Sequence, residues 1–282
     1  MSSAEIAAKV IKGLSREEVK ALNIFSQLIY DYKVVDEYIL SEKGKMHIDR
    51  VRFALSKLNE KKLVFKEEKG YVLLTAGLDA IALKILADKD IIQGLGRAIG
   101  IGKESDVFEG ISNNERVAVK FFRIGRISFR DLRKRGFKEA HNWLIVNIEA
   151  AKNEFNVLNR LYMHCKVPKP IANVKHVIVM QFIEGYRLSY IKLDKPEFVL
   201  RLILDEIKKA YRLGVISADL SEYNILYDGK GIWLIDFPQA ISIEHKDARL
   251  LLERDLRNII RYFNRKYKIE YSLDKALEYI TS

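Results

Sequence analysis

Apolar residues recur at helical spacing through the first 90 residues of the chain. Ser15, followed three positions later by Glu18, is typical of a helix start, and two more amphipathic helices are expected at 35–40 and 48–62. Residues 63–75 form two β-prone runs around a charged turn, which predicts a hairpin. Three helices followed by a hairpin is the order of a winged helix-turn-helix domain, whose third helix enters a nucleic-acid groove.

Basic residues of the expected third helix occupy a different face from its apolar residues. Arg50, Lys57 and Lys61 are therefore candidates for RNA contact. Protein contact is the alternative, because Glu67 and Glu68 in the expected wing would repel phosphate.

The hydrophobic pattern changes after residue 90, where β-prone runs alternate with long amphipathic helices. This change predicts an α+β protein with a first domain at 1–90 and a second at 91–282. The helices are expected at 76–90, 146–162, 198–213 and 248–267, and the clearest strands at 176–183, 225–227 and 232–235.

The net charge of +11 is distributed unevenly. Residues 1–90 hold 16 basic against 14 acidic side chains, so most of the excess lies in the second domain. The densest basic stretch is 123–141, and its interleaved aromatic residues are typical of RNA contact, a solvated loop being the alternative. The candidates for RNA contact there are Arg130, Arg133, Lys134 and Arg135.

A single cysteine, Cys165, rules out an internal disulfide framework and makes a zinc site a poor interpretation. No apolar run approaches the length of a membrane span. We expect a cytoplasmic protein with no membrane partner.

Three polar residues near the end of the chain have the spacing of a phosphoryl-transfer site. Asp219 precedes Asn224 by the D-x-x-x-x-N spacing of a kinase catalytic loop, and a hairpin around Asp228-Gly229-Lys230-Gly231 would bring Asn224 close to Asp236. Carboxylate and amide oxygens suit Mg²⁺, which phosphoryl transfer requires. An ordinary acidic hairpin is the alternative.

Residues that suit a nucleotide lie earlier in the second domain. Gly100 and Gly102 permit close approach of backbone amides to phosphate, and V-A-V-K ends about 20 residues later at Lys120, a fixed cation. Glu154 lies on the apolar stripe of the 146–162 helix and needs a partner there, for which Lys120 is the natural candidate.

These motifs occur in kinase order and together resemble the RIO family of atypical protein kinases. They are G-I-G-K-E-S at 100–105, V-A-V-K, Glu154, D-L-S-E-Y-N from Asp219 and D-F-P-Q from Asp236. The Lys-Glu-Ser loop, D-F-P-Q and the winged helix are similar to its Rio-two branch. The resemblance implies a bilobal kinase-like domain with an N-lobe at 91–180, a hinge at 181–185 and a reduced C-lobe at 186–282.

The resemblance also implies residue roles and partners. Asp219 would be the catalytic aspartate, Asn224 and Asp236 would hold Mg²⁺, with Mn²⁺ as an alternative ion, and Asp236 would also accept phosphate. ATP would lie against the loop with Lys103 and Ser105, the Lys120–Glu154 pair, and backbone groups of Gln181 and Ile183. The biological partner would be the precursor of the small ribosomal subunit, its RNA and proteins. The oligomeric state stays open.

The chain departs from the usual kinase pattern at several places. Pro238 replaces the glycine that follows the metal aspartate, no A-P-E segment follows it, and Ser217-Ala218 stands where the family commonly has His-Gly. Two alternatives to a serine kinase or ATPase therefore remain: an RNA- or ribosome-binding scaffold with weak catalysis, and a small-molecule phosphotransferase of the aminoglycoside or choline kinase kind. We interpret Glu253, Arg254 and Asp255 as a structural salt network.

Overall fold

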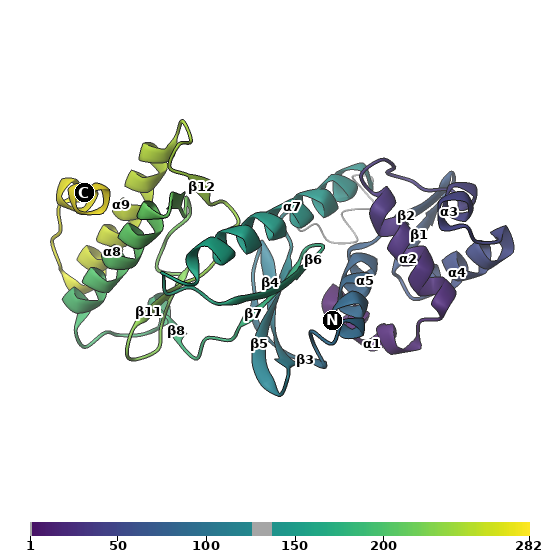
Figure 1. Ribbon diagram of the computed structural model, residues 1–282, viewed down its shortest axis with the longest axis horizontal. Coiled ribbons are helices and arrows are strands. Elements are labelled where there is room, and N and C mark those ends of the chain that lie inside the picture. The colour runs from purple at the N-terminus through teal and green to yellow at the C-terminus, as the bar shows by residue number, and fades with distance from the viewer. Residues whose placement is uncertain (1, 126–136) are drawn as a thin grey trace. The chain divides into compact units, whose positions relative to one another are not determined.

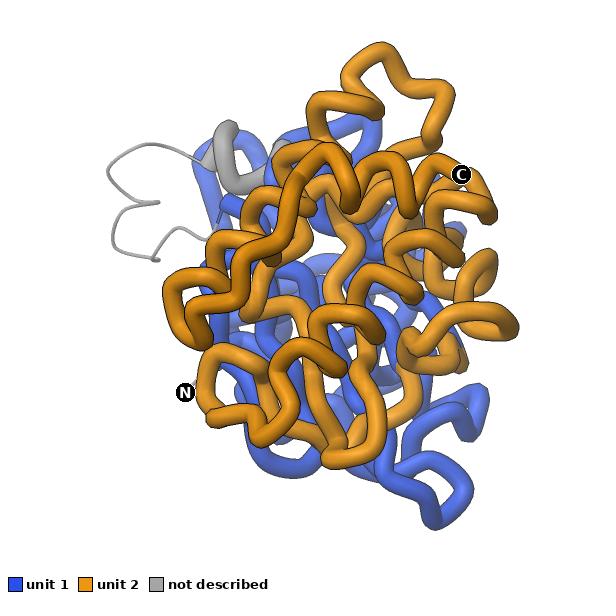
Figure 2. The backbone as a smooth tube through the Cα atoms, turned by 90° about the vertical axis from the view of Figure 1, so that its left-hand side faces the viewer, with its two compact units in different colours: residues 1–151, 172–179 blue, residues 152–171, 180–282 orange. Residues whose placement is uncertain are grey.

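The computed structural model describes residues 2–125 and 137–282 (Figure 1). The chain divides into two compact units (Figure 2), one made of Met1–Ala151 with Ala172–Val179 and the other of Lys152–Ile171 with Met180–Ser282. The first unit therefore contains both the amino-terminal helices and the larger sheet. The expected boundary at residue 90 lies inside the first unit, and the division into domains at 1–90 and 91–282 stays a prediction.

The amino-terminal segment is helical and ends in a small hairpin. The expected capping box of Ser15 and Glu18 is present, while a first helix capped by Ser2 and Glu5 was not predicted from the sequence. This order confirms the winged-helix fold. The elements are α1 (Ser3–Val10), η1 (Ile11–Gly13), α2 (Arg16–Leu28), α3 (Glu37–Gly44), α4 (Ile48–Glu60), β1 (Val64–Glu67), β2 (Gly70–Leu73) and α5 (Thr75–Asp88).

A five-stranded sheet with the order β3-β4-β5-β7-β6 completes the first unit. A two-residue turn joins β4 to β5: Asn113 and Asn114 have φ values of 50° and 65°, and Ser112 pairs with Glu115. Two consecutive residues with positive φ match the twist of a tight hairpin. The strands are β3 (Gly94–Ile101), β4 (Ser105–Ser112), β5 (Glu115–Phe122), β6 (Pro170–Val174) and β7 (Val177–Gln181), and α7 (Phe137–Leu161) follows β5 in the chain.

One hydrophobic core runs through the first unit. Phe25 and Leu55 from the winged helix belong to the same cluster of buried side chains as Phe108 and Val119 from the sheet. Burial of apolar surface is the main favourable term in folding. The winged helix and the sheet therefore stabilise one another.

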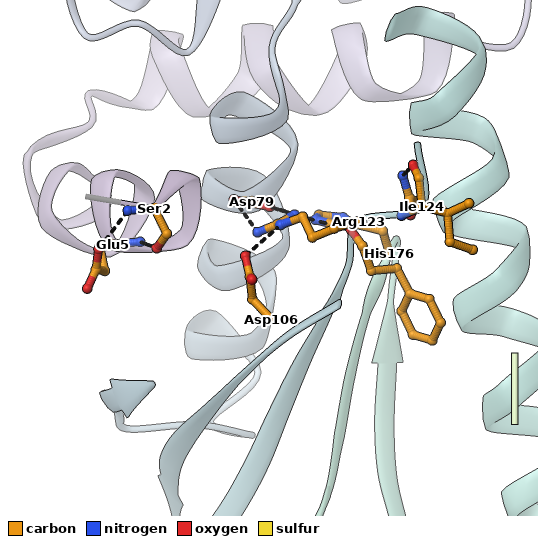
Figure 3. A network of polar contacts seen from close by, with 9 residues as sticks. Ser2, Glu5, Asp79, Asp106, Arg123, Ile124 and His176 are labelled. Carbon is orange, nitrogen blue, oxygen red and sulfur yellow. Dashed lines mark hydrogen bonds and ion pairs between the residues drawn. The ribbon is translucent and has the colours of Figure 1, made fainter. Parts of the chain in front are cut away.

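A buried charged cluster also joins the winged helix to the sheet (Figure 3). Arg123 donates to both carboxylate oxygens of Asp79 on α5, at 2.9 and 2.8 Å, and to Asp106 on β4 at 3.1 Å. The Nε2 atom of His176 lies 2.6 Å from Asp79, and all four side chains are at most 4% exposed. Burial alone would raise the pKa of Asp79, but Arg123 and His176 outweigh it and hold this pKa below its usual value. Burial lowers the pKa of His176, against the opposing effect of Asp79, which raises it.

The second unit is mainly helical with short strands. Among the described residues, no helix combines the length and apolar character needed to cross a bilayer. The strands β10 and β11 form the expected hairpin, and the helix expected at 248–267 has those bounds. The elements are β8 (Tyr186–Arg187), η2 (Leu188–Tyr190), α8 (Pro196–Arg212), β9 (Val215–Ile216), β10 (Ile225–Tyr227), β11 (Ile232–Leu234), β12 (Ile241–Ser242), α9 (Ala248–Tyr267) and α10 (Leu273–Thr281).

Candidate active site

The hairpin of β10 and β11 brings the three predicted phosphoryl-transfer residues together in the second unit. Asn224 donates from its side-chain amide to the backbone carbonyl of Asp219 at 3.0 Å. The carbonyl of Asn224 accepts a hydrogen bond from the amide of Ile235 at 2.9 Å, which sets Asn224 beside the residue preceding Asp236. Asp219 and Asp236, which lie five and twelve residues from Asn224 in the sequence, are therefore brought near it in the fold.

Asp255 on α9 anchors the loop that carries Asp219. Its carboxylate accepts from the amides of Ala218 and Leu220, the two neighbours of Asp219, at 2.8 and 3.0 Å. The guanidinium of Arg254 donates to the carbonyl of Ala218. Ala218 and Leu220 are buried while Asp219 is exposed, so the two bonds to its neighbours hold the candidate catalytic residue at the surface. The sequence indicated only a salt network here, whereas the structure gives Asp255 a positioning role.

Two residues of the site have strained backbones. Ala218 and Asp236 have φ values of 58° and 73°, in the left-handed region that residues other than glycine seldom occupy. An aspartate tolerates this region better than an alanine, because its short polar side chain bonds locally. Strain of this kind persists where the surrounding contacts fix the backbone, and it is concentrated at functional sites.

The donor atoms at this site fit Mg²⁺. The Asn224 amide is oriented by its bond to the Asp219 carbonyl, which leaves its side-chain oxygen as the ligand atom, and Asp236 supplies a carboxylate. Among the described residues, no group of three or more His, Cys, Asp or Glu side chains is placed to hold a metal. Two protein oxygens suit Mg²⁺, which keeps several waters and takes other ligands from substrate phosphates.

The predicted nucleotide loop is a tight turn between β3 and β4. Gly102 donates to the carbonyl of Ser105 at 2.8 Å, and Lys103 is exposed at its tip. Gly100 lies in β3 opposite Val107, next to an irregularity in the strand register. The loop is connected to the buried cluster, because the amide of Arg123 donates to the carbonyl of Glu104 at 2.6 Å.

Lys120 and Glu154 are both buried, with 3% and 1% exposure. Lys120 lies on β5, and its ammonium nitrogen is 4.7 Å from the centre of the Phe122 ring. Glu154 lies on α7, on the inward face that its sequence pattern indicated. The two residues belong to different compact units, so their ion pair stays a prediction.

Backbone hydrogen bonds hold the segment that is expected to be the hinge. The Gln181 amide donates to the Lys169 carbonyl at 2.9 Å, and the Ile183 carbonyl accepts from Gly185 at 3.0 Å. The amide of Gln181 and the carbonyl of Ile183 are therefore engaged within the protein. The groups that these two bonds do not engage are the Gln181 carbonyl and the Ile183 amide. Contact of either residue with adenine stays a prediction.

The RNA-contact candidates of the winged helix have different surroundings. Arg50 is exposed, and Lys57 forms an exposed ion pair with Glu60 at 2.9 Å. Lys61 forms an ion pair with the buried carboxylate of Glu18 on α2, which gives it a structural role between α2 and α4. The other four candidates, Arg130, Arg133, Lys134 and Arg135, lie outside the described residues.

Comparison with known proteins identifies the family. Residues 106–276 match the RIO domain, and residues 11–89 match the Rio2 N-terminal domain. The chain belongs to the RIO kinase family. It is 38% identical over 271 residues to the RIO-type serine/threonine-protein kinase Rio2 of Methanocaldococcus jannaschii, covering 89% of this chain and 98% of the relative. It is 31% identical to the serine/threonine-protein kinase RIO2 of Saccharomyces cerevisiae, covering 94% of this chain and 67% of the relative.

A solved structure supports the same assignment for this RIO kinase. The Rio2 kinase of Chaetomium thermophilum, in an ADP/Mg²⁺-phosphoaspartate complex, superposes with a TM-score of 0.82 at 26% identity, covering 96% of this chain and 88% of that chain. The family is one of serine/threonine protein kinases. This assignment favours a protein kinase over a small-molecule phosphotransferase.

We expect the strained backbone at Ala218 to discriminate between substitutions in this RIO kinase. Glycine relieves the left-handed strain but loses a buried methyl group and gains unfolded-state entropy, so Ala218→Gly should change the free energy of unfolding by less than about 1 kcal/mol. Ala218→Val places a β-branched side chain in the same buried, left-handed position and should destabilise the fold by about 3 kcal/mol. Urea denaturation measures both, and equal effects of the two changes would contradict the strain.

We expect acid to weaken the hold of Asp255 on the catalytic loop. Burial raises the pKa of this carboxyl to about 6, against the opposing effect of the backbone amides that it accepts from. Protonation converts one acceptor oxygen into a donor, so turnover should fall about tenfold as the pH drops through 6. Protonation of Asp255 should lower turnover but raise the free energy of unfolding, because the folded protein binds this proton more tightly than the unfolded chain. The stabilisation from this proton is present below the ordinary pKa of 3.8 and is lost as the pH rises through about 6.

The pH dependence of turnover for the wild type and Asp255→Asn measures this effect. The variant should be slow at every pH and lack the limb near 6. A wild-type limb that survives in the variant would assign the titration to another group.

Proposed function

We propose that this RIO kinase binds ATP with Mg²⁺ and transfers its γ-phosphoryl group, in the cytoplasm, during maturation of the small ribosomal subunit. The observation that carries the catalytic part is the hydrogen bond between Asn224 and Asp219, together with the backbone bond from Ile235, the neighbour of Asp236, to Asn224. The phosphoaspartate in the Rio2 complex of Chaetomium thermophilum supports the assignment of Asp236 as an acceptor.

The proposed chemistry divides between the two carboxylates. Mg²⁺, when bound, neutralises charge on the phosphate oxygens. Asp219 orients the acceptor hydroxyl or water and takes its proton. In the ATPase cycle, an oxygen of Asp236 forms a bond to the γ-phosphorus, the bond to the bridging oxygen breaks, and ADP leaves with that electron pair. Water then hydrolyses the acyl phosphate and releases inorganic phosphate.

Incubation of the full chain with γ-labelled ATP and Mg²⁺ tests the proposal. We expect inorganic phosphate, labelled protein, or both, with Asp219→Ala reducing the rate by about 100-fold or more. Neither product in the wild type, or equal rates in the wild type and Asp219→Ala, would refute phosphoryl transfer. Thermal denaturation of the variant shows whether it is folded.

A scaffold that binds RNA or the ribosome with weak catalysis is the second candidate. One observation favours it: the hydroxyl of Ser217, two positions before Asp219, is buried and lacks a hydrogen-bond partner among the described residues. A scaffold should bind precursor ribosomal RNA with a steep salt dependence that Asp236→Ala leaves unchanged, whereas a nucleotide-driven enzyme should change its RNA affinity with ATP.

A further inference from the structure

The helix α9 carries an arginine ridge, which we define as Arg254, Arg257, Arg261 and Arg265. Their separations of three, four and four residues place them on one face of the helix. All four residues are exposed. The buried residues of α9, among them Asp255 and Leu256, belong to other faces, so the ridge is a solvent-facing surface of the second unit.

The ridge is rich in unpaired positive charge. Among the described residues, no carboxylate lies within ion-pair distance of Arg257 or Arg261, while Arg265 contacts Glu222 at 3.2 Å. The acidic residues of α9 are Glu253, which pairs with Arg249 at 3.1 Å, and the buried Asp255. The positive charges of Arg257 and Arg261 therefore remain available to a ligand.

Arginine in place of lysine indicates what kind of ligand fits. Lysine outnumbers arginine 30 to 19 in the whole chain, yet α9 holds five arginines and one lysine. A guanidinium presents a planar fork of donors that binds two phosphate oxygens at once, which a lysine ammonium does not. Solubility alone would not require arginine in place of lysine on this helix.

The length of the ridge fits a nucleic-acid strand. The eleven residue-to-residue steps from Arg254 to Arg265 span about 16 Å at the rise of an α-helix. If the bases of a single strand stay stacked with the spacing of one strand of B-form DNA, about 3.4 Å along the axis, the ridge covers roughly five nucleotides.

A hollow beside the ridge suits a base. It has a volume of about 700 Å³ and is lined by Arg261, Asn264, Arg265 and Tyr271, with Ile260, Glu270 and Ser272. Tyr271 offers an aromatic face for stacking, and Asn264 offers an amide to a base edge. Glu270 would repel phosphate, which favours a base in the hollow and phosphates along the ridge. An acidic peptide would gain nothing from the tyrosine and would meet the same repulsion.

The ridge lies alongside the catalytic loop. Arg254 donates to the Ala218 carbonyl, Asn258 donates to the Leu220 carbonyl at 3.3 Å, and Arg265 reaches Glu222. A strand bound to the ridge would therefore pass close to Asp219.

We propose that the arginine ridge of α9 binds the phosphate backbone of single-stranded RNA beside the catalytic loop. The proposal rests on the proposed role in ribosome maturation for the choice of RNA, and it does not depend on phosphoryl transfer. The ridge is distinct from the RNA-contact candidates that the sequence predicted in the winged helix and in the 123–141 stretch.

Binding of a labelled single-stranded oligoribonucleotide to the full chain, followed by fluorescence anisotropy at increasing KCl, tests the ridge. The double change Arg257→Ala with Arg261→Ala should weaken binding about tenfold at low salt. It should also reduce the slope of log affinity against log salt by roughly 1.4, or 0.7 for each lost phosphate contact. The change of both residues to Lys should keep most of the slope.

The matched control is Lys246→Ala with Arg249→Ala, which removes the same charge from two exposed positions off the ridge, one just before α9 and one in its first turn. Equal affinity and slope for the ridge variant and this control would overturn the proposal, as would competition by polyglutamate at the strength of unlabelled RNA. Absence of RNA binding in the wild type would overturn both the ridge and the RNA role, whereas loss of ATP turnover alone would leave the ridge intact. If the ridge variant unfolds, crosslinking of RNA that contains 4-thiouridine to the wild type tests the proposal instead. We expect crosslinked peptides from α9, and their absence would overturn the proposal.

Discussion

Asp236→Asn should reduce ATP turnover by about 1,000-fold or more and abolish acyl-phosphate formation. An amide keeps the shape of the side chain but loses the negative charge that binds Mg²⁺ and the oxygen nucleophile that would accept phosphate. The local backbone bond from Ile235 to Asn224 does not involve the Asp236 side chain, so the hairpin should persist. Release of labelled phosphate from ATP measures turnover. Lability of the protein-bound label to hydroxylamine distinguishes an acyl phosphate from phosphoserine.

Asp228→Asn is the matched control for this prediction, because it makes the same chemical change in the same hairpin. Asp228 accepts from the amides of Lys230 and Gly231 at 2.9 and 2.7 Å and from the Trp233 indole at 2.8 Å, all contacts within the turn. This variant should keep turnover within a few-fold of the wild type while losing some stability. If the Asp236→Asn variant still carried a hydroxylamine-sensitive label, the phosphate acceptor would be another carboxylate.

The sequence was sufficient to predict the hairpin that carries the candidate site, because the pattern that specifies it is local. Asp219, Asn224 and Asp236 lie within eighteen consecutive positions, and the glycine-bearing turn between the strands fixes how they meet. The winged helix was predictable for the same reason, since capping residues and helical periodicity are read within single elements.

The positioning residues were not predictable because their partners are distant in sequence. Asp255 is 37 residues from Ala218, and one aspartate on a helix gives no sign of which backbone amides it will meet. Asp79 likewise lies in a largely apolar helix, 44 residues before Arg123 and 97 before His176. A charged residue surrounded by apolar ones does indicate that some partner exists. Which partner depends on tertiary packing.

The thermal stability of the first unit should depend on Asp79 more than on any exposed ion pair. Asp79→Asn replaces the carboxylate that accepts two hydrogen bonds from Arg123 with an amide whose NH₂ group faces the guanidinium. Arg123 would then remain buried with Asp106 as its anionic partner in the cluster. Breaking one side of a buried ion pair costs about 3–5 kcal/mol, because the remaining charge is left desolvated. We expect the thermal midpoint to fall by about 10 °C.

The exposed pair of Arg52 and Glu37, at 2.8 Å, supplies the control within the same unit. Glu37→Gln also removes one partner of an arginine ion pair, but water solvates the arginine that remains, so the midpoint should hardly move.

The Asp79 cluster also reaches the nucleotide loop through the bond from the Arg123 amide to the Glu104 carbonyl. Asp79→Asn should therefore weaken ATP binding at temperatures well below its midpoint. Equal midpoints for Asp79→Asn and Glu37→Gln would mean that apolar contacts alone join the winged helix to the sheet.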